Sequence, residues 1–466
     1  MSTGPPAAPS VVTNGGRWPQ FWADGMAGLL TALVFYAEYA SLGSYLGEQL
    51  PGAASAAQGA LSVLGAVILA ALLSIAQKRS ILAGPRAASL AVLVGGIAIA
   101  LRANADPIRA QDVAAVALSG MLIVAGLMQM LGRTRWVRTG IGALPTPIRK
   151  GFMFATAIAI VTGLSSRQLN ACLQFDPIPT VAIVASSLAI YFLWISWCQK
   201  KGESRRSLLP LGVPIAAATS TIGYYTSMGV AARGIDRCGT LGTGGLDWSQ
   251  LMTTPRLLDG AIARANLSST TLVVLLGFGI ALGIVLLLES LTTLADSEAR
   301  VSPDEWPRIL TISALVNVLS AFAGFSCNSL STSRTNALVE ANGRTSASAL
   351  VHGIALLAIL VLLVEWIGKL PQLTIAVVLI IVATQMIDQV LRQEIWSRGF
   401  ASDALPRSRL QTWQFIGLVM TSVLFGLVMT LFKKPFGTGA VIALVAVIAL
   451  QGGTWMLSRL SSRNST

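Results

Sequence analysis

The chain has 466 residues, of which 54% are hydrophobic and only 11% are charged, and its mean hydropathy is +0.69. Soluble proteins carry about 25% charged residues, so these charges are too few to cover soluble domains of this total length. The net charge of +13 comes without a basic face interleaved with aromatic residues, which argues against nucleic acid as a partner. One histidine and four cysteines without metal-ligand spacing indicate no metal and no cofactor.

Apolar runs long enough to cross a bilayer core of about 30 Å recur along almost the whole chain. Residues 1–20, rich in Pro, Gly and Ser, are predicted to form a disordered cytoplasmic tail without a signal peptide. The first half then predicts seven membrane segments, at 21–47, 56–77, 84–101, 110–131, 147–169, 179–199 and 208–230. The second half predicts seven more, at 271–293, 307–324, 330–342, 347–367, 371–390, 412–431 and 435–457.

The distribution of Lys and Arg supports this count, because cytoplasmic loops of membrane proteins are enriched in these residues. With both termini in the cytoplasm, the inner loops hold roughly twice as many basic residues as the outer loops. An odd number of spans in each half reverses the direction of the second half, as in the inverted repeats of secondary transporters. We therefore expect transmembrane repeats at 21–230 and 271–457, an extracytoplasmic linker at 231–270 and a short cytoplasmic tail at 458–466 in a cell (inner) membrane protein.

The predicted linker has two further features. Its stretch 246–265 is expected to form a short surface helix, with Trp248 at the membrane interface. Its Cys238 and the outer-loop Cys172 both face the oxidising side, where they either pair in a disulfide or remain two small unpaired residues.

Four charged residues lie well inside the predicted spans, where each costs about 2.5–3.5 kcal/mol on insertion scales and is a functional candidate by default. Glu38 and Glu289 lie late in the first and eighth spans, which correspond to each other in the two repeats. Arg86 and Arg334 open the third and tenth spans, at similar distances after their glutamates. The matched order predicts that the two repeats contribute equivalent halves to one site.

The third and tenth spans both begin with helix-start signals. The third opens with Gly84-Pro85, and proline is favoured at the first helical position, whereas the tenth opens with the polar run 327–335, which offers Asn and Ser as N-cap residues. Both are predicted to be half-helices that start in mid-membrane, where a broken backbone is tolerated only around a protein-lined cavity. Helix N-termini favour anions. The predicted anion site therefore comprises Gly84, Pro85, Arg86, Ala87, Ser331, Thr332, Ser333, Arg334 and Thr335.

A coupling ion is a further prediction. Glu289 and Thr293 lie one helical turn apart and are suited to holding a proton or a sodium ion, and Glu38 is the second candidate for this role. Structural interpretations stay open: Gly-Pro as a kink, the Ser-rich run as helix packing, the glutamates as structural pairs, and Arg334 paired with Glu289 or Glu340. The single histidine, His352, is interpreted as a core hydrogen-bonding residue rather than a proton relay.

These residues resemble motifs of the SulP family of sulfate permeases. The resemblance covers Asp24-Gly25-Met26-Ala27-Gly28-Leu29, Ala32-Leu33-Val34, Glu38, Gly84-Pro85, Gly151-Phe152, Glu289-Ser290, Ser333-Arg334-Thr335 and Asn342-Gly343-Arg344-Thr345. Two positions depart from the family pattern, since Ala37 replaces the usual proline of the first span and Arg86 directly after Gly-Pro is unusual. The resemblance implies a core domain (spans 1–4 and 8–11), a gate domain (spans 5–7 and 12–14), and a homodimer. The chain is expected to lack the cytoplasmic STAS domain that family members usually append.

The sequence thus predicts an all-α membrane protein of about 14 segments, arranged as a 7+7 inverted repeat with two half-helices, and not an enzyme. Its predicted activity is secondary transport of a small inorganic anion, sulfate or bicarbonate, across the lipid bilayer by alternating access. Coupling to H⁺ or Na⁺ is part of this hypothesis. Two alternatives are a nucleobase-type permease on the same fold and an anion channel-like protein.

Overall fold

The structure is a computed structural model that describes residues 17–47, 50–51, 55–104, 106, 108–135, 137, 166–200, 211–227, 261–296, 301–368 and 370–391. The helices of the first repeat are α1 (Arg17–Gly47), α2 (Ser55–Gln77), α3 (Ala87–Ala103), α4 (Ala110–Leu131), α7 (Ser166–Phe175), α8 (Pro177–Lys200) and α9 (Gly212–Ser227). They are followed by α12 (Ala261–Ala265), α13 (Ser269–Asp296), η4 (Pro303–Glu305), α14 (Trp306–Ala323), α15 (Thr332–Glu340), α16 (Ser346–Gly368) and α17 (Gln372–Leu391). Two short strands, β1 (Ala83–Gly84) and β2 (Ser329–Leu330), precede α3 and α15.

The observed helices confirm the mostly helical membrane fold expected from the apolar runs. The ends of α2, α3, α4, α13, α14, α15, α16 and α17 fall within about three residues of the predicted spans. Five of the described helices are long and apolar enough to cross a membrane, and α1 makes a sixth if its two parts, bent by 41° between Tyr36 and Glu38, form one span. The bend thus occurs without the family's proline. The predicted segments 412–431 and 435–457, and most of 147–169, lie outside the described residues, so the count of 14 stays a prediction.

The end of the fifth predicted span differs from expectation. Residues 166–169 belong to α7, a separate helix that continues through the predicted outer loop. This helix is amphipathic: Leu169 and Cys172 pack against Leu373 of α17, whereas Asn170 is exposed. A hydropathy window ends at such polar residues, although tertiary packing stabilises the helix. Cys238 lies outside the described residues, as does most of the linker, whose described part contains α12.

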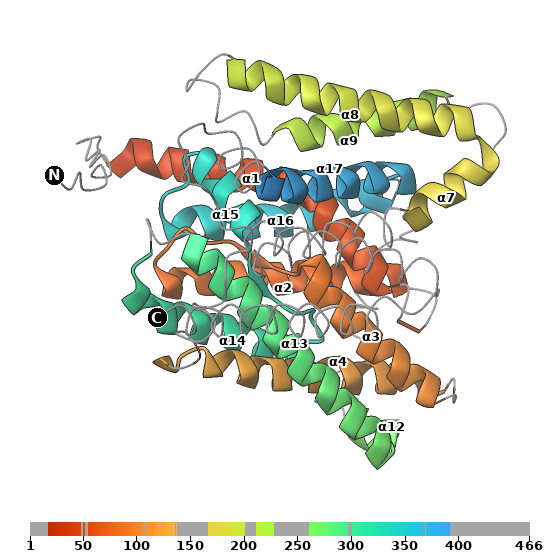
Figure 1. Ribbon diagram of the computed structural model, residues 1–466, viewed down its shortest axis with the longest axis vertical. Helices are drawn as coiled ribbons and strands as arrows, with labels where there is room; N and C mark the ends of the chain where they lie inside the picture. The colour runs from red at the N-terminus through yellow and green to blue at the C-terminus, as the bar shows by residue number, and fades with distance from the viewer. Residues whose placement is uncertain are drawn as a thin grey trace, which may run out of the picture.

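The described helices form two groups (Figure 1). In one group α13 packs against α4 and α3, α14 against α4 and α2, and α1 against α2 and α16. In the other, α8 packs against α9, and α17 contacts α7, α8 and α9. Helix α1 contacts α9 and α17 and so bridges the groups. This division matches the core and gate domains that the family resemblance implied.

At the centre of the first group, the extended segments before α3 and α15 pair with each other. Strands β1 and β2 are antiparallel, with Ala83 opposite Leu330 and Gly84 opposite Ser329. The pairing continues at Leu82, whose carbonyl accepts a hydrogen bond from the Ser331 N–H at 3.0 Å. Because the strands are antiparallel, α3 and α15 start near one point and run in opposite directions. With nine residues, or about 14 Å, α15 crosses only half of the bilayer core.

The irregular segment between α14 and α15 has its backbone groups satisfied by neighbouring helices. The Ser326 N–H donates to the Ser62 carbonyl of α2 at 3.0 Å. Asn328 is held on two sides: its N–H donates to Asn317 Oδ1 of α14 at 2.6 Å, and its Nδ2 donates to the Ala66 carbonyl of α2 at 2.8 Å. Lipid offers no hydrogen bonds at this depth, so such protein partners are required for a broken helix. The start of α15 is therefore fixed by both α2 and α14.

Asp24 joins two of the signature motifs. Its Oδ1 accepts hydrogen bonds from the N–H groups of Arg344 at 2.7 Å and Thr345 at 3.2 Å, and its Oδ2 accepts one from Thr345 Oγ1 at 2.7 Å. The carboxylate therefore binds otherwise unpaired N–H groups before the start of α16. The first-span motif and the Gly343-Arg344-Thr345 motif, far apart in sequence, form one structural unit.

Helices α1 and α2 cross at a pair of glycines. A Cβ atom added at Gly59 would lie 2.1 Å from the Gly43 carbonyl oxygen and 2.4 Å from the Gly47 nitrogen. One added at Gly43 would lie 2.4 Å from the Cα of Ala60. Small residues allow such close backbone approach in membrane helices, where packing rather than the hydrophobic effect drives association. The position of α1, which carries Glu38, therefore depends on this contact.

The Gly59→Ala variant is expected to be destabilised by about 1–3 kcal/mol, because its methyl group meets rigid backbone on α1. Thermal unfolding of the detergent-purified protein measures this as a lower melting temperature. Gly120→Ala is the matched control, since a Cβ there meets nothing within 4 Å. Equal melting temperatures of the two variants would contradict the close crossing.

A second contact ties the loop after α2 to the segment before α14. Arg79 Nη2 lies 2.8 Å from Glu305 Oε2, and Arg79 Nε lies 3.1 Å from the same oxygen. The Ser302 N–H also donates to this carboxylate. The hydrogen bonds from Arg79 hold the pKa of Glu305 below its ordinary value of 4.5. The ion pair therefore joins the loop after α2 to the segment before α14 at the protein surface.

A lowered pKa in the folded state means that the pair stabilises the protein above pH 4.5, and that the contribution is lost as pH falls through the lowered pKa. Both side chains are partly exposed, so Glu305→Gln is expected to cost at most about 1 kcal/mol at neutral pH. Melting temperatures of wild type and variant, compared across pH, should converge on acidification. A difference in melting temperature that does not change with pH would exclude the Arg79–Glu305 ion pair as its cause.

Candidate functional site

Arg334 lies in the first turn of α15 and its side chain is 1% exposed. Ser331 caps this helix, and its Oγ accepts the Arg334 N–H at 3.5 Å. The guanidinium Nη2 donates to Glu38 Oε1 of α1 at 2.6 Å and to the Pro85 carbonyl before α3 at 2.7 Å. The side chain thus connects α1, α15 and the start of α3. The sequence had offered Glu289 and Glu340 as its partners, and the structure places it on Glu38 instead.

Two aromatic rings of α1 lie against the same guanidinium. The ring centroid of Tyr39 is 4.5 Å from Arg334 Cζ, and that of Phe35 is 5.9 Å away. These residues are four apart and therefore share one face of the helix. Ring faces attract cations, which offsets part of the cost of burying the charge. Sequence reasoning missed both rings, although their spacing beside Glu38 was the available signal.

The remaining guanidinium donors are unpaired in the described part of the chain. Nε and Nη1 of Arg334 are buried and have no hydrogen-bond partner among the described residues. A Cβ added at Gly84 would lie 2.5 Å from Nη1, so glycine leaves the room that this group occupies. A guanidinium grips an oxyanion in two bonds along its Nε–Nη2 or Nη1–Nη2 edge, and Nη2 belongs to both edges. Neither edge is complete while Glu38 and Pro85 hold Nη2.

Glu289 of α13 forms the second charged position, and it is 2% exposed. Its Oε2 is buried and has no hydrogen-bond partner in the described part of the chain. Arg86 is the N-cap residue of α3, and its carbonyl accepts the Ser89 hydroxyl at 3.1 Å. Of the four charged residues, Arg334 and Glu38 form an ion pair, and this pair links the two repeats.

The hydroxyl of Thr293 is directed at the backbone. Its Oγ1 lies 2.9 Å from the Glu289 carbonyl and 3.1 Å from the Leu330 carbonyl, and it accepts a hydrogen bond from Thr332 Oγ1 at 3.0 Å. These contacts hold β2 and the start of α15 against α13. The predicted role of Glu289 and Thr293 in holding a coupling ion stays a prediction.

The other predicted site residues lie at the same helix starts. Thr335 Oγ1 accepts the Leu82 N–H at 3.1 Å, and the hydroxyls of Ser331 and Ser333 lie 3.3 Å apart. Ala87 is the first residue of α3. The structure therefore brings the residues predicted at the two helix starts together around the β1–β2 pair.

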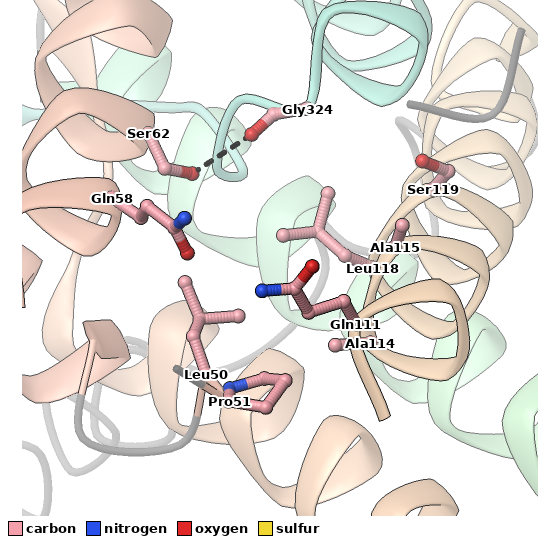
Figure 2. A pocket seen from close by; sticks show the side chains of 10 residues that line it. All are labelled: Leu50, Pro51, Gln58, Ser62, Gln111, Ala114, Ala115, Leu118, Ser119 and Gly324. Carbon is pink, nitrogen blue, oxygen red and sulfur yellow. Dashed lines mark hydrogen bonds between the residues drawn. The ribbon is translucent and has the colours of Figure 1, made fainter. Parts of the chain in front are cut away.

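A separate small cavity of about 50 Å³ lies between α2 and α4 beside Gly324. The side chains of Gln58 and Gln111 extend into it from different helices, and Ser62 Oγ donates to the Gly324 carbonyl at 3.2 Å (Figure 2). Ser62 also binds the segment before β2 through its carbonyl. The cavity thus borders that segment, whereas the residues that line it do not include the four charged ones.

The fold and these buried helix starts define an integral membrane transporter of the inverted-repeat class. Residues 175–405 match the sulfate permease family, the family whose motifs the sequence resembles. No curated protein sequence matches the chain.

Solved structures have the same fold. The transmembrane domain of a cyanobacterium bicarbonate transporter, BicA, matches with a TM-score of 0.61 at 19% identity, over 90% of this chain and 100% of that one. A structure of SLC26A9 matches with a TM-score of 0.57 at 14% identity, over 94% of this chain and 66% of that one. The murine Slc26a9 anion transporter in the inward-facing state matches with a TM-score of 0.54 at 13% identity, over 94% and 69%.

The Glu38–Arg334 pair generates a stability prediction. Glu38→Gln leaves the buried guanidinium without its counter-charge and is expected to destabilise the protein by about 3–5 kcal/mol. The double variant Glu38→Gln/Arg334→Gln removes both charges and should be more stable than Glu38→Gln. Melting temperatures in detergent test this order, with Asp106→Asn of the exposed Arg109–Asp106 pair as the control. A double variant that is the least stable of the set would contradict a compensating buried pair.

Proposed function

We propose that this protein is a secondary transporter that carries a small inorganic oxyanion, sulfate or bicarbonate, by alternating access. The observation that carries the proposal is the buried guanidinium of Arg334, whose Nε and Nη1 lack a partner among the described residues. Buried donors without acceptors are costly, so a site that keeps them is expected to bind an acceptor ligand. An anion meets this requirement.

The helix starts supply a second attraction for the same ligand. Helices α3 and α15 begin at Ala87 and Thr332, close to the paired strands, and their first turns carry free N–H groups and the positive dipole ends. Such N-termini bind anions without needing further cations. Burial strengthens the effect, because little water screens the charge.

Glu38 is proposed to couple transport to a proton. An oxyanion that binds Arg334 along a two-donor edge needs an Nη2 hydrogen that now bonds Glu38 or the Pro85 carbonyl, and on the Glu38 edge it competes with this carboxylate. Protonation of Glu38 neutralises its carboxylate and weakens this competition. With two arginines and two glutamates in the site, the proton also compensates one unit of the incoming negative charge. Glu289, which is buried on α13, is the second carboxylate in this scheme.

Alternating access is supported by the position of α1. This helix carries Phe35, Glu38 and Tyr39 at the site and also contacts α9 and α17 of the other helix group. A displacement of one group against the other therefore acts on the residues that hold Arg334. We propose a homodimer in a cell membrane with both termini in the cytoplasm, as the sequence predicts.

The anion is proposed from the relatives. BicA is described as a bicarbonate transporter and murine Slc26a9 as an anion transporter, and the family is that of sulfate permeases. Bicarbonate is a monovalent oxyanion near neutral pH and sulfate a divalent one. Both offer oxygens to the Arg334 donors, so an uptake experiment decides between them.

The test is uptake of radiolabelled sulfate and bicarbonate by the full chain in proteoliposomes, with and without sodium and with proton gradients of either direction. Wild type should show saturable uptake that an inward proton gradient accelerates. Arg334→Lys loses the planar set of donors and should reduce uptake on the order of 10- to 100-fold, since charge-assisted hydrogen bonds contribute about 1.5–3 kcal/mol each. Arg109→Lys, at the exposed Asp106 pair, is the control with unchanged uptake.

Several outcomes would overturn the proposal. Undiminished uptake by Arg334→Lys would remove this residue from the site. Saturable uptake of uracil without anion uptake would favour a nucleobase permease, and a non-saturating anion current would favour a channel. Stimulation by sodium alone would replace the proton as the coupling ion.

A further inference from the structure

Three polar side chains link α1 and α16 next to the charged site. Thr31, Tyr39 and His352 are each 0% exposed. Thr31 Oγ1 lies 3.0 Å from His352 Nδ1, and the Tyr39 hydroxyl lies 3.4 Å from His352 Nε2. The imidazole therefore stands between two hydroxyl groups of α1. Thr31, His352 and Tyr39 thus form a series of contacts, and the Tyr39 ring at its end also contacts Arg334.

The hydrogen bonds around Thr31 fix the direction of this series. Its Oγ1 lies 2.8 Å from the Ala27 carbonyl and 3.0 Å from the Gly28 carbonyl, and these acceptors take its single hydrogen. Thr31 then accepts a hydrogen bond from His352, which places the imidazole proton on Nδ1. His352 Nε2 is left as an acceptor, and the Tyr39 hydroxyl donates to it. Both ring nitrogens are satisfied by one neutral tautomer.

This anchor restricts the ring that supports Arg334. A tyrosine has only two side-chain torsions, and a bond at its hydroxyl restricts both. The His352 ring packs edge-on against Tyr39, with centroids 6.1 Å apart and an interplanar angle of 73°. The face of Tyr39 in turn lies 4.5 Å from Arg334 Cζ. The orientation of the guanidinium is thereby tied to a residue of α16.

We propose that His352 is a positioning residue of the anion site, which acts through Tyr39 to aim the free Nε and Nη1 donors of Arg334. The imidazole touches neither the ligand nor Arg334 in this scheme. His352 acts on the affinity for the anion. Without its hydrogen bond, the Tyr39 ring next to the guanidinium can move, and part of the binding free energy is lost in ordering this ring and the guanidinium. The inference rests on the proposed function.

A purely structural role for His352 is the competing explanation. Helices α1 and α16 are already in close contact at Gly28, where an added Cβ would lie 2.5 Å from the Ser348 carbonyl and 2.9 Å from the His352 nitrogen. The Asp24 carboxylate also holds the start of α16. The helix pair therefore has other contacts, and the hydrogen bond to Tyr39 is not required to join it.

The experiment measures KM and maximal rate of radiolabelled anion uptake for Tyr39→Phe, His352→Leu and the double variant in proteoliposomes. Each single variant should raise KM on the order of 3- to 10-fold while changing the maximal rate little, as expected for a lost cation–π support. The double variant should have the KM of either single one, because both remove the same interaction. His352→Gln keeps an acceptor and a donor on one amide and should restore much of the affinity. Tyr36→Phe, which removes a hydroxyl three residues earlier on α1, is the matched control.

Distinct results separate the two proposals. If wild type takes up no anion, the proposed function fails and this inference fails with it. If wild type takes up anion but KM is unchanged in both single variants, only the inference fails. It also fails if the two KM effects multiply in the double variant, or if lower maximal rates merely follow lower melting temperatures at constant KM.

Discussion

The cost of unpaired backbone groups in lipid is the constraint on which this structure depends. Each broken helix leaves N–H and C=O groups that the bilayer cannot satisfy, at several kcal/mol apiece. Here the two breaks satisfy each other, through the β1–β2 pair and the bond between Ser331 and Leu82. Further backbone groups of the break before α15 bond the Ser62 carbonyl of α2 and the side chains of Thr293 of α13 and Asn317 of α14. The same pairing fixes where α3 and α15 begin, and with them the position of Arg334.

Charge burial couples the repeats in a similar way. Arg334 and Glu38 belong to different repeats, so their buried ion pair joins the two. The free-energy cost of taking a charged pair out of water is offset only by good geometry and additional hydrogen bonds. Arg334 obtains these from Glu38, Pro85 and the rings of α1. The donors that stay unpaired among the described residues, Nε and Nη1, are the ones that we propose to bind the substrate.

In the proposed site, affinity also depends on residues that touch no ligand. Glycine at position 84 leaves space for Nη1, whereas Tyr39 and His352 order the opposite side of the guanidinium. A small buried site tolerates little error in donor direction. The proposed positioning of the guanidinium therefore involves residues of α1 and α16 as well as α15.

The sequence by itself determined the helices and the positions of the breaks. Apolar run length sets a span, and Gly-Pro or Asn-Ser signals set a helix start, because both are properties of a few neighbouring residues. Hence α2, α4, α13 and the starts of α3 and α15 were predictable. Only the tertiary structure decided which partners meet. Glu38 reaches Arg334 across 296 positions, Thr293 turns to the backbone of Leu330, and His352 anchors Tyr39, since these contacts depend on how helices cross in space.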